Sequence, residues 1–187
     1  MSLDLAACSD GELAALALGG RQLAYSELMQ RHRGSVFRLL RSHVGDADAA
    51  VDLTQQSFIA AFSALHSYDG ERPFRLWISR IAINKARDWG RRRAVRRFFT
   101  FARPIEEAWH IADGTAGADV ELADRHELER TMAAIGTLPA NLREVLVLRT
   151  IEELSQAETA GALGISGKAV ETRLYRARAK LAEILGG

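Results

Sequence analysis

The sequence has little cysteine, little proline and no long apolar run. Among its 187 residues Cys8 is the single cysteine, which excludes an internal disulfide and a cysteine-cluster zinc site. No stretch approaches the roughly 20 consecutive apolar residues that a membrane-spanning helix needs. Residues 1–5 contain no basic region and precede no hydrophobic run, so they are not a secretory signal. We therefore expect a cytoplasmic protein without membrane insertion.

Motifs for covalent chemistry and for metal binding are also lacking. The five histidines do not fall at metal-ligand spacing, such as two on one helical face with an acid between them. The sequence contains neither a glycine-rich phosphate loop nor a Gly-x-Ser-x-Gly nucleophile elbow. We expect no enzymatic activity, no catalytic residues, no metal ion and no cofactor.

Positive charge is concentrated in two segments, although the net charge of the chain is only +1. Residues 72–103 contain eleven Lys or Arg against one Asp, and residues 166–180 contain five against one Glu. Between them, residues 104–129 contain eight Asp or Glu against one Arg. This distribution predicts contact with a polyanion at two places that are separated by a solvated acidic spacer.

Apolar residues recur at three- and four-residue spacing over most of the chain, which predicts amphipathic helices. Such stripes cover 13–18, 23–40, 51–65, 74–89 and 128–135. The turn-forming pair Gly45-Asp46 and the Ser, Asp, Gly and Pro residues of 66–73 mark breaks between them. We expect an all-α fold of two small helical domains, 1–97 and 119–187, that are joined by a flexible acidic linker over 98–118.

The end of the chain predicts a helix-turn-helix. Ser155 and Glu158 form a capping box before a short apolar helix, and Gly164 marks a tight turn before a long basic helix. Cationic side chains of such a second helix neutralise phosphates, while its first residues reach base edges. The alternative is an ordinary helical hairpin with a solvated charged face. Residues 144–151 also allow a buried strand, which the flanking helical pattern disfavours.

The first basic segment combines charge with aromatic side chains. Arg80, Asn84, Arg87 and Arg91 follow one another on one side of the predicted helix 74–89, opposite a side that includes Trp77. Aromatic rings beside a cationic groove are typical of proteins that bind unpaired nucleotides, because bases stack on the rings. The alternative is that the aromatic residues fill the core, which we favour for Trp77. For Tyr68, which lies in a predicted loop, both interpretations stay open.

Four motifs, taken together and in this order, resemble the extracytoplasmic-function sigma factors of bacterial RNA polymerase. They lie at 48–58, with the core Asp52-Leu53-Thr54-Gln55-Gln56, and at 74–84, 138–143 and 175–181. The resemblance runs from Ser9 to Leu185 in the order and length of that family. It implies a promoter-specificity subunit that binds core RNA polymerase, recognises two DNA elements and melts the minus-ten element.

The resemblance also implies a role for individual residues. Contact with core polymerase falls to Asp48, Asp52, Gln55, Gln56 and Phe58. Contact with the minus-ten element falls to Ser67, Tyr68, Asp69, Arg72, Phe74, Arg80, Asn84, Asp88, Arg91 and Arg92. Contact with the minus-thirty-five element falls to Arg149, Lys168, Glu171, Thr172, Arg173, Tyr175 and Arg176. The implied partners are the coiled coil of the largest polymerase subunit, the flap of the second-largest subunit, promoter DNA and an anti-sigma factor.

Two departures from the family pattern motivate other hypotheses. Gln56 stands where the family usually has Glu, and Glu171 stands where it commonly has a basic residue. They favour a sigma mimic that binds an anti-sigma factor without binding DNA, whereas the two basic segments argue against one. A free-standing repressor would need a dimer to read two half-sites, and the sequence has no dimerisation heptads.

Overall fold

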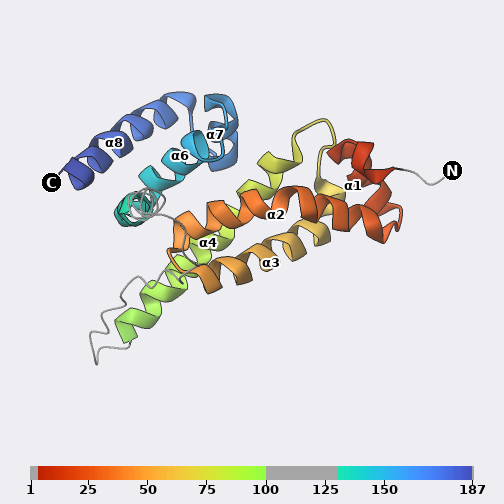
Figure 1. Cartoon of the computed structure of the whole chain (residues 1–187), viewed down its shortest axis with the longest axis horizontal. Helices are drawn as coiled ribbons and strands as arrows, with labels where there is room; N and C mark the ends of the chain where they lie inside the picture. Colours follow the sequence, from red (N-terminus) through yellow and green to blue (C-terminus); the bar gives the residue numbers. More distant parts are fainter. Residues whose placement is uncertain (1–3, 100–129, 187) are drawn as a thin grey trace, which may run out of the picture.

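The computed structural model describes residues 4–99 and 130–186, and these are mostly helical (Figure 1). The helices are η1 (Leu5–Ala7), α1 (Asp10–Leu18), α2 (Gln22–Val44), α3 (Ala47–Ser63), η2 (Leu65–Ser67), α4 (Phe74–Phe99), α6 (Ala140–Thr150), α7 (Gln156–Leu163) and α8 (Gly167–Gly186), with a further helical stretch over 130–137. The described ranges contain no strand, and residues 144–150 of the segment that also allowed a strand lie in α6. The predicted all-α fold is confirmed.

Local capping sets where several helices begin and end. The Ser9 hydroxyl accepts from the backbone N–H of Glu12 and the Glu12 carboxylate accepts from that of Ser9, which is a capping box at the start of α1. The predicted box of Ser155 and Glu158 opens α7 in the same way. The left-handed backbone of Gly164, with φ 67°, then ends α7 and turns the chain into α8. This confirms the predicted helix-turn-helix.

The first lobe consists of three long helices, α2, α3 and α4, with α1 packed near one end of the group (Figure 1). Leu28 and Leu40 of α2, Leu53 of α3 and Ile78 of α4 are buried in the core that these helices share. Because an apolar helical stripe is stable only when it is covered, this packing decides which face of α4 stays in water.

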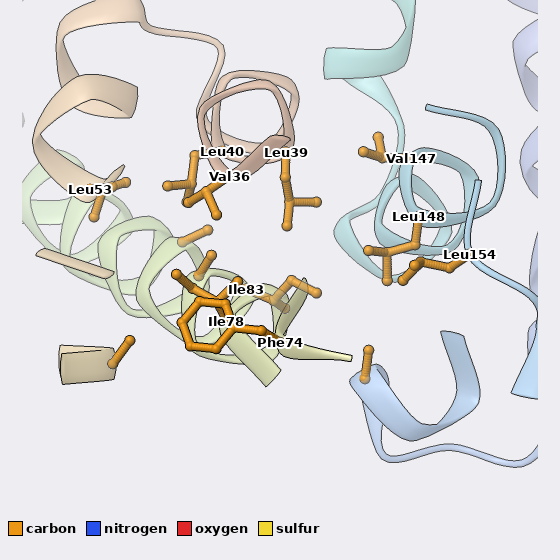
Figure 2. Close-up of a cluster of buried hydrophobic side chains, with 14 of the residues drawn as sticks. Val36, Leu39, Leu40, Leu53, Phe74, Ile78, Ile83, Val147, Leu148 and Leu154 are labelled. Carbon is orange, nitrogen blue, oxygen red and sulfur yellow. The ribbon is translucent and has the colours of Figure 1, made fainter. Parts of the chain in front are cut away.

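The second lobe consists of the helical stretch 130–137 with α6, α7 and α8, and it packs on the first lobe through α2 and α4. Figure 2 shows apolar side chains of both lobes, with Leu39 of α2 on one side and Val147 and Leu148 of α6 on the other. These residues belong to one continuous hydrophobic cluster. The two lobes therefore lie in a closed arrangement in this structure.

The first two residues of the predicted linker, 98 and 99, lie at the end of α4. Helix α4 continues to Phe99, because Arg and Ala favour a helix and a run of positive charge alone does not end one. The rest of the predicted linker, 100–118, lies outside the described residues, as does the predicted domain boundary at 119. Within the described ranges, no helix combines the length and the apolar character that crossing a bilayer requires.

The loop before α4 is held against α1 by a contact between two backbones. A Cβ atom added to Gly11 of α1 would lie 2.6 Å from the carbonyl oxygen of Gly70. The nearest atoms to this Cβ all belong to the backbone of Gly70, so the added methyl group has no flexible side chain to displace. The loop can therefore approach α1 this closely only because residue 11 is a glycine.

We predict that Gly11→Ala destabilises the protein by about 1–3 kcal/mol, because the overpacked backbone must shift. The measurement is urea unfolding followed by circular dichroism. Gly161→Ala is the matched control, since a Cβ on Gly161 of α7 meets nothing within 4 Å. The control is expected to be neutral or stabilising. Equal stability of the two variants would contradict the close approach of Gly11 to Gly70.

His43, at the end of α2, is expected to make stability depend on pH. Burial lowers its pKa to about 4, against 6.5 in an unfolded chain, while Glu144, Arg143 and Arg87 act on it as neighbouring charges. As the pH falls from 7 to 5, the unfolded chain gains a proton that the folded chain does not bind. The folded state should therefore lose about 2 kcal/mol from this group over that range.

The comparison of wild type with His43→Gln at pH 7 and pH 5 measures this contribution. The variant lacks the titrating group, so its loss of stability should be smaller by about 2 kcal/mol. A nuclear magnetic resonance titration of the wild-type ring is an independent check. A His43 ring that gains its proton near pH 6.5 would refute the prediction.

Candidate nucleic-acid and polymerase interfaces

The exposed face of α4 carries four of the residues predicted to contact the minus-ten element: Arg80, Asn84, Arg91 and Arg92. The opposite face, which includes Ile78 and Ala82, is buried. Asp88 is half-buried and accepts a hydrogen bond from Arg91, so one guanidinium of this face already has an acidic partner. The remaining charge makes the face strongly cationic, as contact with a phosphate backbone requires.

An aromatic cluster lies where α4 begins. The rings of Tyr68, Phe74 and Trp77 are 5.2–5.5 Å apart between centroids. The Phe74 side chain is 0% exposed, so the expectation that it meets a nucleotide directly is corrected. It is instead a core residue that supports the other two rings. Trp77 is half-buried and packs against the core, in line with the interpretation favoured above.

Tyr68 is held in place from both ends. Its ring packs on Phe74, and its hydroxyl donates a hydrogen bond to the backbone carbonyl of Arg72. Burial raises the pKa of Tyr68 to about 12, so the phenol stays neutral at ordinary pH. Tyr68 as a whole is half-buried at the edge of the loop. The position of Tyr68 therefore agrees with both interpretations that the sequence left open, which are packing against the core and contact with a nucleotide.

The end of η2 and the loop over 68–73 expose the other residues predicted there. Ser67, Asp69 and Arg72 are exposed, and the Asp69 carboxylate lies 3.1 Å from the Arg72 guanidinium. The same carboxylate accepts from the backbone N–H of Glu71. This loop is thus a structured, polar neighbour of the cationic face of α4.

The exposed face of α3 carries the residues predicted to contact core polymerase, with one exception. Asp48, Asp52, Gln55 and Gln56 are exposed. Phe58 is only 2% exposed, and its ring packs against that of Phe62, so the expectation that it faces a partner is corrected.

Sequence reasoning missed two apolar residues on the same side of α3. Ile59 is 66% exposed and Val51 is 42% exposed, although the periodicity placed Val51 in the buried stripe. They flank Gln55 at four-residue spacing, so all three lie on one helical face. The only signal in the sequence was that spacing. Apolar periodicity along a helix does not indicate which of two adjacent rows of apolar residues is buried.

The residues predicted to contact the minus-thirty-five element lie mainly on α8. Val170 and Ala177 are buried and fix the orientation of this helix. Lys168, Glu171, Thr172, Tyr175 and Arg176 are exposed, and Arg173 is half-buried. Arg149 lies near the end of α6, where its guanidinium donates to the carbonyl of Leu154. The exposed side of α8 is therefore free to approach a partner.

An ion pair joins the two lobes. Arg87 of α4 donates two hydrogen bonds to Glu144 of α6, at 2.8 Å from Nε to Oε1 and 2.7 Å from Nη2 to Oε2. The Glu144 side chain is only 3% exposed. Arg87 lies on the same side of α4 as Arg80 and Arg91, but in this arrangement its guanidinium is directed to Glu144 of the other lobe.

A second buried carboxylate lies at the same junction. Glu152 follows α6, and burial raises its pKa, while Arg38 and Arg75 of the first lobe act in the opposite direction. Among the described residues, Glu152 Oε1 has no hydrogen-bond partner. The junction thus contains carboxylates from the second lobe and arginines from the first.

Comparison with known proteins identifies two family regions in the chain. Residues 28–96 match the model of sigma-70 region 2, and residues 128–181 match that of sigma-70 region 4. The chain is 41% identical over 180 residues to the RNA polymerase sigma factor CnrH of Cupriavidus metallidurans, covering 95% of this chain and 94% of that protein. It is 30% identical over 178 residues to the ECF RNA polymerase sigma factor SigM of Mycobacterium tuberculosis, covering 95% and 85%.

Solved structures agree with these matches. The structure of CnrH in complex with the cytosolic domain of CnrY has a TM-score of 0.70 and 37% identity, and the match covers 95% of this chain and 97% of that one. The sigma factor RpoE in complex with the anti-sigma factor NepR, from Bartonella quintana, shares the fold, with a TM-score of 0.73 at 21% identity over 87% of this chain and 96% of that one. Together with the two matched regions, these relatives show that the chain belongs to the extracytoplasmic-function sigma factors of bacterial RNA polymerase.

Proposed function

We propose that this sigma factor binds core RNA polymerase through the exposed face of α3 and directs initiation at promoters with two recognition elements. In this proposal, α4 and the loop before it contact the minus-ten element, and α8 contacts the minus-thirty-five element. The observation that carries the proposal is that α4 exposes a row of cationic and polar side chains beside a loop containing a half-buried tyrosine. The two functional units are residues 1–97 and 119–187.

Strand separation follows from differential binding. A base that leaves the stack and is held at the loop offsets an unpairing cost of a few kcal/mol. Tyr68 offers a ring edge, while Ser67 and Asp69 offer polar groups to the base. Arg80 and Arg91 then neutralise the phosphates of the separated strands. Because these contacts form only with open DNA, they favour the melted state.

Recognition of the upstream element uses the exposed side of α8. Lys168 and Thr172 lie in the first part of the helix, which is the part that reaches base edges in helix-turn-helix proteins. Arg176 and Arg149 bind phosphates. Glu171 is exposed on the same side and accepts a hydrogen bond from a cytosine amine, which makes it a specificity residue.

Contact with core polymerase uses the side of α3 that faces away from the lobe. Asp52, Gln55 and Gln56 supply polar contacts to the coiled coil of the largest subunit, and Ile59 supplies an apolar one. The flap of the second-largest subunit meets the second lobe. The protein acts in the cytoplasm, performs no covalent chemistry and is controlled by an anti-sigma factor. The complexes of CnrH with CnrY and of RpoE with NepR support this last point.

The closed arrangement must open for this function. Two elements centred near positions −10 and −35 are about 25 base pairs apart, which is about 85 Å of duplex. A compact chain of this length has a radius of gyration of only about 16 Å. Both lobes therefore reach their elements together only after they separate.

We predict that reversing the charge of α4 with Arg80→Glu and Arg91→Glu reduces promoter opening about 100-fold, on the order of 1.4 kcal/mol for each lost contact. The measurement is permanganate reactivity of unpaired thymines in a promoter selected from genomic fragments with wild-type holoenzyme. Affinity for purified core polymerase should stay unchanged.

The matched control is Arg21→Glu with Arg33→Glu, which makes the same change in net charge at exposed positions of the first lobe. The control should open promoters normally. Normal opening by the α4 variant would disprove the minus-ten assignment, and failure of wild-type holoenzyme to initiate at any genomic fragment would reject the proposed function itself.

We further predict that Glu144→Gln raises the affinity for core polymerase about fivefold, which corresponds to about 1 kcal/mol. The closed state reduces the fraction of binding-competent protein, and the amide no longer pairs with the Arg87 charge. Equilibrium titration of labelled sigma factor with core polymerase measures the effect. Glu183→Gln on the exposed side of α8 is the control. Unchanged affinity of Glu144→Gln would show that the ion pair does not oppose binding.

A further inference from the structure

Helix α1 lies against the loop that precedes α4. This helix, residues 10–18, comes before the segment 28–96 that matches sigma-70 region 2, so the family match does not account for it. The backbone of Gly70 lies so close to Gly11 that position 11 has no room for a side chain. The first turn of α1 is therefore part of the surface on which the loop over 68–73 packs.

The Asp10 carboxylate, in the same turn of α1, binds two side chains of α2. Its Oδ1 atom lies 3.2 Å from Nη1 of Arg31, and its Oδ2 atom lies 2.8 Å from Nε2 of His32. An ionised carboxylate only accepts, so Nε2 carries the ring proton and donates it. The His32 side chain is only 12% exposed, so this hydrogen bond is largely shielded from water and fixes the orientation of the ring.

Arg31 does not depend on Asp10 for its position. Its guanidinium has four other acceptors, which are the carbonyls of Leu5, Ala6 and Cys8 and the carboxylate of Glu27. These bonds hold η1 against α2 with or without Asp10. Loss of the Asp10 carboxylate would therefore act mainly on His32.

The His32 ring belongs to the aromatic cluster at the start of α4. Its centroid lies 5.1 Å from that of Phe74, and the Phe74 centroid lies 5.3 Å from that of Tyr68. Tyr68 is bound to its own loop, because its hydroxyl donates to the backbone carbonyl of Arg72. A continuous series of contacts thus joins the Asp10 carboxylate to the loop.

The charge of Asp10 also acts on Tyr68. Burial is the main cause that raises the pKa of Tyr68, and the negative charges of Asp10 and Asp69 act in the same direction. Because charge interactions weaken with distance, this effect agrees with the series of contacts.

We propose that Asp10 and His32 are positioning residues for the loop over 68–73. Their hydrogen bond fixes the His32 ring, which keeps Phe74 and Tyr68 in the arrangement that receives an unpaired base. The inference rests on the proposed function of the loop, and neither residue of the pair contacts DNA. A loop that is ordered beforehand loses less conformational entropy when the base binds, so the pair increases the affinity for open DNA.

The test is the affinity of holoenzyme for forked templates in which the minus-ten strand is unpaired. The templates come from a promoter that wild-type holoenzyme selects from genomic fragments. One template is intact, and each of the others lacks the base of one minus-ten nucleotide. Wild type should bind about tenfold more weakly when the captured base is missing, as expected for one stacked base.

Asp10→Ala should reduce this discrimination. It should bind the intact template about fivefold more weakly than wild type and the template without the captured base equally well. The effect of the missing base then falls from about tenfold to about twofold. Affinity for purified core polymerase should stay unchanged.

Glu12→Ala is the matched control. It removes another carboxylate from the start of α1 and breaks the capping box with Ser9, so it weakens the helix and leaves the contact of His32 in place. The control should retain the full discrimination. An equal loss in Glu12→Ala and Asp10→Ala would overturn the inference, because it would show that only the stability of α1 matters.

His32→Phe covers the case in which Asp10→Ala does not fold. It keeps a ring beside Phe74 but cannot donate to Asp10. The variant should also show about twofold discrimination, and combination with Asp10→Ala should cause no further loss, because both changes break one contact. Full discrimination in His32→Phe, or losses that add in the double variant, would overturn the inference.

The wild-type measurement separates this inference from the proposed function. If wild type responds to a missing base and Asp10→Ala responds equally, the positioning role is refuted and the proposed function stands. If wild type responds at no minus-ten position, base capture at the loop is refuted and the inference fails with it.

Discussion

The packing of α4 against α2 and α3 is the constraint on which the rest of the structure depends. Burial of Phe74, Ile78 and Ile83 in the first lobe leaves one orientation for this helix. The cationic face then points outward as a consequence, and the aromatic cluster supports the loop that precedes it. A helix with so much positive charge is unstable by itself, because like charges repel along its length. The apolar face supplies the free energy that the charged face does not.

The junction between the lobes meets a different requirement, since it must be stable enough to close and weak enough to open. Apolar contact around Leu39 and Leu148 is continuous with both cores (Figure 2). Exchange of both Glu144 and Arg87 for apolar residues would cost little, because desolvation of the carboxylate offsets much of its attraction to the guanidinium. Removal of one partner alone leaves the other charge unpaired at the junction, and this weakens the closed arrangement.

Much of the fold was predictable because its signals are local. The apolar stripes, the capping box of Ser155 and the turn at Gly164 each lie within a few residues of what they determine. The exposed residues of α4 and α8 were also predictable, since polar side chains at helical spacing share a face. By contrast, Phe58, Phe74 and Val51 were assigned to the wrong environment. An aromatic or branched residue at the edge of a stripe suits both a core and a binding surface.

The sequence by itself determined the helices, their caps, the helix-turn-helix and the two basic segments, because each depends on neighbours along the chain. Only the tertiary structure decided which lobe the side chain of each arginine contacts. Arg87 and Glu144 are 57 residues apart, and no periodicity relates them. Arg87 and Glu144 also line a cavity of about 640 Å³ whose walls come from helices of both lobes, so this cavity depends on the same docking. Which residues pair across so many positions depends on how the cores pack, and the spacing of residues along the chain carries no information about it.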